Sequence, residues 1–116
     1  PKDQGKKLWE GLSEHFPQAE TQLSQQVMIE RLMSIQSVET IRCMQEGVLT
    51  SAGDANIGSI FGWGFAPFKG GTLQYVNDCG VKSFLTRTRH LAETYGERFS
   101  PPDLLVEKAQ KNERFL

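Results

Sequence analysis

Residues 24–46 form a segment without proline or glycine in which apolar positions recur at helical spacing. Two apolar stripes run along it, the first made by Met28, Leu32 and Ile35 and the adjoining one by Val38, Ile41 and Met44. Such a wide apolar arc is typical of a helix that is buried on more than one side. Gly47 follows where a glycine in the left-handed conformation often ends a helix.

The clearest amphipathic pattern spans residues 81–95. Its apolar and small side chains fall at i, i+3, i+4, i+7, i+10, i+11 and i+14, which is one face of a helix. They are Val81, Phe84, Leu85, Thr88, Leu91, Ala92 and Tyr95. Gly96 is placed to end this helix.

Capping residues predict a helix over about residues 52–61. Ser51 and Asp54 have the spacing of a capping box, in which the hydroxyl accepts a first-turn amide and the acid favours the positive end of the helix. We expect this helix to bury Ile57, Ile60 and Phe61.

Two further short helices are predicted near the C-terminal end. Thr72 is placed to cap a helix that runs through Asp78 and is closed by Gly80, with two apolar residues, Leu73 and Val76, facing inward. The last helix begins at Ser100-Pro101-Pro102-Asp103, with serine as N-cap and proline at the first helical position.

The remaining pattern is a weak helix within residues 3–15, around Leu8, Trp9 and Leu12, that ends before Pro17. No segment alternates with period two for long enough to predict a strand. The sequence therefore predicts an all-α fold, a single compact domain of about five helices.

A glycine-rich loop spans residues 62–71. We expect it to lack regular structure but to be ordered and packed, because its large apolar side chains need burial. The residues assigned to packing or to an interface are Gly62, Trp63, Gly64, Phe65, Pro67, Phe68, Gly70 and Gly71. Anion binding is the weaker alternative, since the loop has neither the Lys-Ser/Thr of a P-loop nor a strand-turn-helix frame.

Composition narrows the function further. The chain of 116 residues has a formal net charge of -1 and no basic stripe, which argues against nucleic-acid binding. No apolar run is long enough to predict a transmembrane segment. The two cysteines, Cys43 and Cys79, lack the spacing of a zinc site or a disulfide framework, so we expect a reducing compartment, by default the cytoplasm.

No catalytic, cofactor-binding or metal-binding residue is assigned. We interpret His90 as solvated, His15 as a helix-end residue, and both cysteines as small apolar residues without a neighbouring base. No nucleophile, base and orienting group can be named together, and a reaction cannot be proposed without them.

Several ordered motifs resemble the helical C-terminal domain of the L-3-hydroxyacyl-CoA dehydrogenase family, in particular the last repeat of multifunctional fatty-acid β-oxidation enzymes. They are Glu30-Arg31-Leu32-Met33, the run from Glu39 to Val48, Asp54-Ala55-Asn56-Ile57-Gly58, the loop from Gly62 to Thr72, the run from Tyr95 to Pro102, and the ending Asn112-Glu113-Arg114-Phe115-Leu116. The resemblance covers about residues 24–116. It implies a helical domain like the C-terminal domain of 6-phosphogluconate dehydrogenase over residues 21–116, with residues 1–20 as a lead-in.

The resemblance also implies a larger parent enzyme. In that family a nucleotide-binding domain carries NAD and the catalytic His-Glu pair, and two helical repeats follow it. This chain resembles the second repeat, so its implied partners are the preceding repeat, the nucleotide-binding domain, the parent's acyl-CoA substrate, and a thiolase subunit as a candidate. NAD and catalysis would then belong to the parent, and the chain itself would be inactive but able to self-associate. A bacterial parent would be cytoplasmic, and a eukaryotic one mitochondrial or peroxisomal.

Two observations qualify this interpretation. Relatives whose helical domain touches substrate have Asn directly before Arg-Leu, whereas this chain has Glu30 there, which argues against acyl-CoA contact. The chain opens with Pro1-Lys2-Asp3 rather than Met, as a piece of a longer polypeptide would. The alternative function is a free-standing helical protein-interaction module that has lost the enzyme.

Overall fold

The computed structural model describes residues 5 and 7–116. Its helices are α1 (Leu12–His15), α2 (Gln25–Gln45), α3 (Ala52–Trp63), η2 (Pro67–Lys69), α4 (Thr72–Cys79), α5 (Val81–Tyr95), η3 (Glu97–Phe99) and α6 (Asp103–Lys111), where η denotes a 3-10 helix. This described part contains no strand. The predicted all-α class is confirmed, and the five helices α2–α6 match the expected number.

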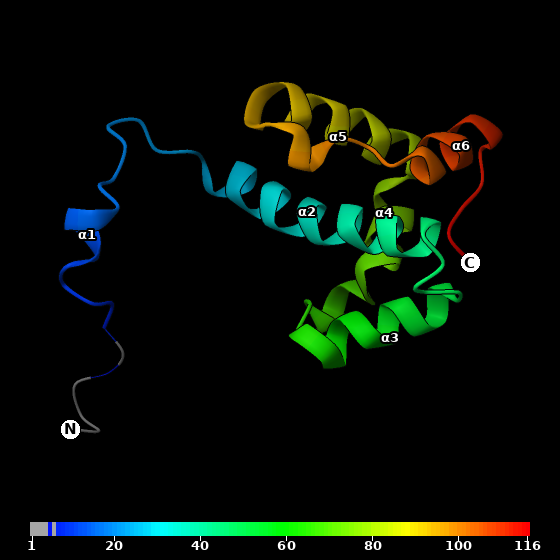
Figure 1. Cartoon of the computed structure of the whole chain (residues 1–116), viewed down its shortest axis with the longest axis horizontal. Coiled ribbons are helices and arrows are strands. Elements are labelled where there is room, and N and C mark those ends of the chain that lie inside the picture. The colour runs from blue at the N-terminus through cyan, green and yellow to red at the C-terminus, as the bar shows by residue number, and fades with distance from the viewer. Residues whose placement is uncertain (1–4, 6) are drawn as a thin grey trace.

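The long helix α2 runs through the middle of the domain (Figure 1). It packs against α4, α5 and α6, whereas α3 packs mainly against α4 on the other side. The short helix α1 lies apart from this bundle and buries no residue. Of the helix predicted within residues 3–15 only α1 is formed, and residues 3, 4 and 6 of that prediction lie outside the described residues.

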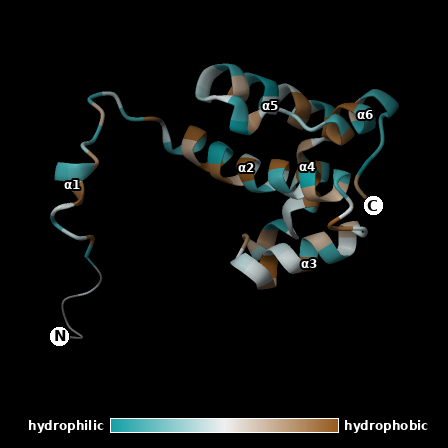
Figure 2. Ribbon diagram, viewed as in Figure 1, coloured by the Kyte–Doolittle hydropathy of each residue, from teal (hydrophilic) through white to brown (hydrophobic). Residues whose placement is uncertain are grey.

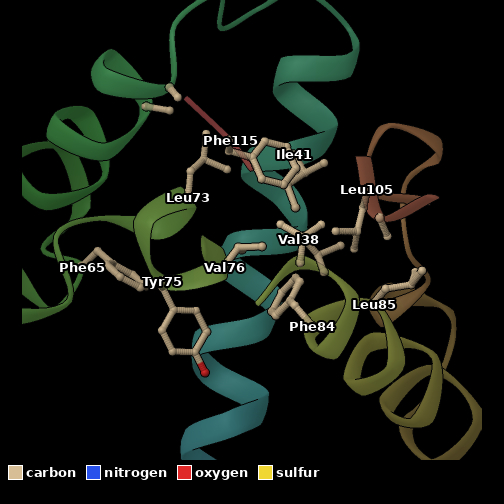
Figure 3. Packing of buried hydrophobic residues seen from close by; sticks show 14 residues of the cluster. Val38, Ile41, Phe65, Leu73, Tyr75, Val76, Phe84, Leu85, Leu105 and Phe115 are labelled. Atoms are coloured by element: carbon tan, nitrogen blue, oxygen red, sulfur yellow. The ribbon is translucent and has the colours of Figure 1, made fainter. Parts of the chain in front are cut away.

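The core lies where α2, α4, α5 and α6 meet (Figure 3). The fully buried side chains include Val38 and Ile41 from α2, Val76 from α4, Phe84 from α5 and Leu105 from α6. Complete burial of an aliphatic or aromatic side chain stabilises a fold by about 1.5–3 kcal/mol. This convergence of four helices therefore accounts for much of the stability of the domain.

Only the second apolar stripe of α2 supplies this core. In the first stripe Leu32 is 63% exposed and Met28 is 45% exposed. The expectation that both stripes are buried is wrong for the first one, because no described element covers the outer side of the first half of α2. The structure also shows an N-terminal cap on this helix, since the Ser24 hydroxyl accepts the Val27 amide at 3.2 Å.

Helix α3 buries its small side chains rather than its large ones. Ala55 and Ser59 face the core, whereas Ile57 and Phe61 are exposed, so the predicted burial is wrong for these two. Ile60 is half-buried, so its predicted burial is met only in part. The reason is the close approach of α3 to the start of α4. A Cβ on Gly71, whose φ is +108°, would lie only 2.5 Å from the Cα of Asn56.

The starts of α4 and α6 also differ from the prediction, because side chains from other helices cap them. The Asn56 Oδ1 accepts the Leu73 and Gln74 amides at 2.9 and 3.0 Å, so Thr72 is the first residue of α4 rather than its cap. The cap of α6 is Pro102 rather than Ser100. Its first-turn Leu104 amide donates to Gln45 Oε1 at 2.8 Å. Such long-range partners leave no local sequence signal.

Several other predicted helix ends are confirmed, although α3 ends at Trp63 rather than near residue 61 and α4 ends at Cys79 rather than at Asp78. Gly47 and Gly96 both have positive φ, the Ser51 hydroxyl accepts the Asp54 amide at 3.3 Å, and α5 spans the predicted residues. Leu73 and Val76 are fully buried, as expected for the inner face of α4.

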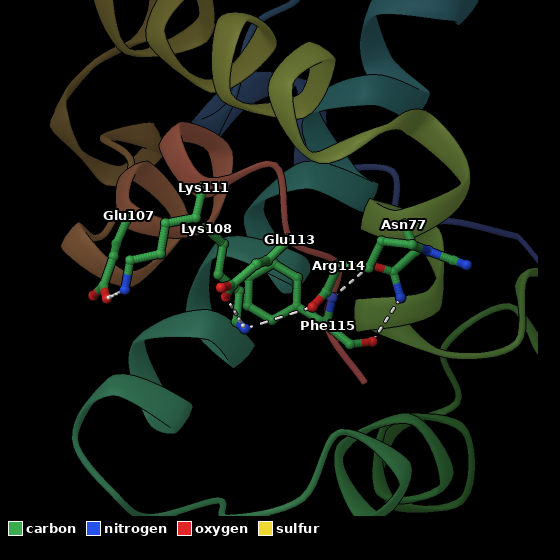
Figure 4. Close-up of polar contacts among 7 residues, drawn as sticks. All are labelled: Asn77, Glu107, Lys108, Lys111, Glu113, Arg114 and Phe115. Atoms are coloured by element: carbon green, nitrogen blue, oxygen red, sulfur yellow. Dashed lines mark hydrogen bonds and ion pairs between the residues drawn. The ribbon is translucent and has the colours of Figure 1, made fainter.

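The segment after α6 returns to the core (Figure 4). Asn112 ends the helix in the left-handed conformation, with a φ of +59°. The Asn77 side chain then donates to the Phe115 carbonyl at 2.7 Å and accepts the Phe115 amide at 2.8 Å. This double hydrogen bond holds the buried Phe115 ring against α4.

Candidate functional site

The glycine-rich segment is more regular than expected. Helix α3 continues through Trp63 and ends at Gly64, which has a φ of +75°, and a 3-10 turn covers Pro67–Lys69. The prediction of a segment without regular structure is therefore wrong at these two places. One helical glycine costs only about 1 kcal/mol relative to alanine, so Gly62 does not stop a helix that is already formed.

Phe65 is the residue of this loop that joins the core. Its side chain is 2% exposed and its ring meets the Tyr75 ring edge-on, with 6.3 Å between the centroids. The amide of Phe65 donates to the Ser59 carbonyl at 3.0 Å, which fixes the backbone directly after α3. The loop is thus packed, as expected, through this one ring.

The other two aromatic rings of the loop point outward. Phe68 is 84% exposed and Trp63 is 56% exposed. The Trp63 indole donates to Gln36 Oε1 at 2.9 Å, which orients the ring beside α2. We call the exposed apolar set the four exposed side chains made up of Phe68 from the loop and Ile57, Phe61 and Trp63 from α3. The ribbon in Figure 2 marks hydrophobic positions within α3 in brown.

A hollow of about 440 Å³ lies between α2, the segment that joins α2 to α3, and the Trp63 ring at the end of α3. Its lining residues are Gln36, Glu39, Thr40, Cys43, Val48, Leu49 and Trp63, and the exposed part of its wall is apolar. Cys43 is half-buried in this wall. The hollow has the size and character of a recess that receives apolar side chains of a neighbouring surface.

A polar cluster joins α4 and α5. The Arg87 guanidinium donates to the Tyr75 hydroxyl at 2.8 Å and to the Cys79 sulfur at 3.5 Å. Burial raises the pKa of the Tyr75 phenol above its ordinary value, although the positive charge of Arg87 acts in the opposite direction. The cluster was missed because its members come from two helices and share no motif.

The histidines lie away from this cluster. His90 is exposed on α5, and His15 stacks on Trp9 with 5.5 Å between ring centroids. Within the described residues no group of three or more His, Cys, Asp or Glu side chains is arranged to hold a metal ion. No described helix is long and apolar enough to cross a membrane.

The fold and the surface together define a class: a helical domain with a small, well-formed core that leaves large apolar side chains of one helix and its loop uncovered. Exposed apolar surface of this kind marks protein contact sites.

Comparison with known proteins adds the biological context. The chain matches no family model. It is 42% identical over 77 residues to the fatty acid oxidation complex subunit alpha of Vibrio vulnificus and 40% identical over 77 residues to the subunit of that name from Shewanella loihica. Each match covers 66% of this chain but only 11% of the relative. The resemblance to multifunctional fatty-acid oxidation enzymes is thereby confirmed, and the match spans about a tenth of the length of these relatives.

Proposed function

We propose that this chain is the second helical repeat of a multifunctional β-oxidation enzyme and that it braces the dehydrogenase half of that enzyme. The parent would oxidise L-3-hydroxyacyl-CoA to 3-oxoacyl-CoA with NAD and would also carry an enoyl-CoA hydratase half. NAD and the catalytic pair would lie in a nucleotide-binding domain outside this chain, and the bacterial relatives favour a cytoplasmic enzyme.

The observation that carries this proposal is the exposed apolar set, in a chain that matches only a small part of much longer relatives. Ile57, Phe61 and Phe68 are each at least 60% exposed. Burying a side chain of this size contributes about 1.5–3 kcal/mol, so a neighbouring repeat that covered the set would be held firmly. The loop residues Gly62, Gly64, Pro67, Gly70 and Gly71 would then shape this interface by presenting Trp63 and Phe68.

The composition of this surface favours a bracing role over substrate binding. Acyl-CoA carries phosphates and needs cationic partners, whereas the exposed apolar set consists of apolar side chains; the cation that the described structure places against it is Lys69, whose Nζ lies 5.7 Å from the Phe68 ring centroid. Glu30, at the position where substrate-contacting relatives have Asn, adds a negative charge on α2. We therefore place acyl-CoA in the parent's other domains.

The first test is enzymatic. The isolated chain should show no turnover of acetoacetyl-CoA with NADH, because the nicotinamide site and the base would lie outside it. The parent enzyme, assayed in parallel, should be active. Turnover that survives removal of contaminating parent enzyme would refute this part of the proposal.

The second test is assembly. Trp63→Ala or Phe68→Ala should weaken binding of this domain to the rest of the dehydrogenase half, supplied as a separate polypeptide, without loss of helix content by circular dichroism. Leu116→Ala is the matched control, since Leu116 is 93% exposed and belongs neither to the exposed apolar set nor to the hollow beside Trp63. Equal binding by all three variants and the original chain would contradict the assignment.

The second candidate function, a free-standing helical interaction module, is favoured by the same exposed apolar set. The open reading frame separates the two. A coding sequence that continues upstream into a Gly-x-Gly-x-x-Gly after a strand supports the enzyme, because that motif builds a dinucleotide site. A gene that starts within a few codons of Pro1 supports the module. Self-association of the isolated chain and binding of a thiolase subunit to the parent remain predictions to be measured by sedimentation.

A further inference from the structure

Residues 8–16 carry apolar side chains that the described structure leaves uncovered. Leu8 is 82% exposed, Trp9 67% and Phe16 72%. The segment nevertheless has a defined local conformation, because the Leu12 amide donates to the Trp9 carbonyl at 3.1 Å and the Trp9 ring stacks on His15. It is therefore a compact apolar turn that needs a partner surface.

An open apolar groove lies on the bundle, between the first half of α2 and η3. It has a volume of about 350 Å³, and we call it the α2–η3 groove. Its lining residues are Met28, Arg31, Leu32, Ile35, Arg98 and Phe99. Its floor is therefore the stripe of α2 that the sequence predicted to be buried and that the structure leaves exposed.

The charges of the turn and the groove are complementary. Arg31 and Arg98 line the groove, and neither has an ion-pair partner among the described residues. Arg31 is held in place by stacking on the Tyr95 ring, with its guanidinium carbon 4.2 Å from the ring centroid. The turn carries Glu10 and Glu14, both exposed. The two negatively charged glutamates of the apolar turn are thus complementary in charge to the two positively charged arginines of the apolar groove.

The connection between them is long enough. Residues 17–24 join the turn to α2. Eight residues span up to about 26 Å when extended at about 3.3 Å each. The α2 side of the groove extends from Met28 to Ile35. At a rise of about 1.5 Å per residue, every point on it lies within about 17 Å of Ser24 along the helix. The turn can therefore reach the whole groove of its own chain.

We infer that residues 8–16 dock into the α2–η3 groove of the same chain, with their apolar side chains on Met28, Leu32 and Ile35 and with Glu10 and Glu14 facing Arg31 and Arg98. The extended arrangement in Figure 1 is then the undocked form. Docking covers the exposed stripe of α2 and attaches the lead-in to the bundle. It uses a different surface from the exposed apolar set.

Tryptophan fluorescence tests this directly, because Trp9 and Trp63 are the only tryptophans in the chain. In the Trp63→Phe chain, Trp9 reports on the turn alone. We expect acrylamide to quench Trp9 several-fold more slowly in this chain than after the further substitution Leu32→Asp, which places a charge on the groove floor. Val48→Asp is the matched control and should leave the quenching rate unchanged, since Val48 is exposed elsewhere.

Two further measurements test the role of the charges and whether the turn that fills the groove belongs to the same chain. The double variant Glu10→Lys, Glu14→Lys should raise Trp9 quenching as Leu32→Asp does, with unchanged helix content. Protection of Trp9 should not depend on protein concentration, because the turn belongs to the same chain.

Three results would overturn the inference. Trp9 could be quenched as fast in the Trp63→Phe chain as in its Leu32→Asp derivative. Protection could rise with protein concentration, which would make a second copy the occupant. Protection could be present only in the longer parent, which would make the preceding part of that polypeptide the occupant. None of these results changes the assembly test of the exposed apolar set, so the two proposals fail separately.

Discussion

At the scale of single residues, one amide side chain links two helices. Asn56 lies within α3, and its Oδ1 accepts hydrogen bonds from the backbone amides of Leu73 and Gln74 in the first turn of α4. It therefore acts as the N-cap of a helix to which it does not belong. A side-chain acceptor at this place satisfies donors that a helix start otherwise leaves without partners.

Removal of this acceptor should have a measurable cost. Asn56→Ala is expected to lower the free energy of unfolding by about 0.5–2 kcal/mol, the range for loss of an N-cap. Asn56→Asp keeps the acceptor and adds a negative charge at the start of α4, which is worth about 0.3–1 kcal/mol in favour of the helix. Urea unfolding followed by circular dichroism measures both. An aspartate variant as unstable as the alanine variant would show that the cap is not the cause.

Tyr75 gives the stability a pH dependence. Burial is the largest cause that raises the pKa of its phenol, so the folded chain keeps this proton to higher pH than the unfolded chain does. The associated stability is fully present below the pKa of an unfolded tyrosine, about 10, and is lost as the pH rises through the folded pKa. We therefore expect the urea concentration at the midpoint of unfolding to decrease as the pH is raised above about 10. Tyr75→Phe should flatten this alkaline slope, and an equal slope in the original chain and the variant would contradict the assignment.

At the scale of elements, the loop after α3 divides its aromatic residues between two roles. Phe65 is 2% exposed and Phe68 is 84% exposed, although only two residues separate them. Phe65→Ala should destabilise the domain by about 3–5 kcal/mol, as for a large aromatic side chain removed from a core. Phe68→Ala should change the free energy of unfolding by less than about 0.5 kcal/mol. Chemical unfolding of both variants checks this, and a large loss with Phe68→Ala would place that ring in the core.

The same contrast shows what the sequence could predict. Periodicity located α2 and α5, because each has a stripe that packs directly on the core. It failed for α3, where Ile57 and Phe61 form the outer face. There the inner face is set by the close approach to Gly71, which admits only side chains the size of Ala55 or Ser59.

The candidate site was predicted as a segment but not residue by residue. Composition identified the glycine-rich loop as packed, since large apolar side chains stand between its glycines. It could not tell that Phe65 turns inward and Phe68 outward, because this depends on the left-handed turns at Gly64 and Gly70. The capping of α4 and α6 by Asn56 and Gln45 was equally hidden, since each partner lies 17 or more positions away.

At the scale of the whole molecule, the core is completed by the segment that follows α6. Phe115 is 3% exposed, and Asn77 binds both its carbonyl and its amide. Phe115→Ala should lower the free energy of unfolding by about 3–5 kcal/mol. The neighbouring Leu116 is 93% exposed, so Leu116→Ala is the matched control and should be neutral within about 0.5 kcal/mol. Thermal unfolding of the two variants tests this, and similar melting temperatures would contradict the role of the Phe115 ring.

The small-residue contact of α3 has a consequence for local opening. The helix contains Gly53, Gly58 and Gly62, each costing about 0.8–1.0 kcal/mol relative to alanine, and it buries only alanine and serine side chains. It should therefore open on its own with a smaller free energy than α2 or α5, whose large side chains anchor the core. Backbone amides of α3 should exchange with deuterated water before those of the other long helices. A partner that covers α3 would slow this exchange. Deuterium uptake by α3 therefore reports whether a partner is bound there, without any enzymatic assay.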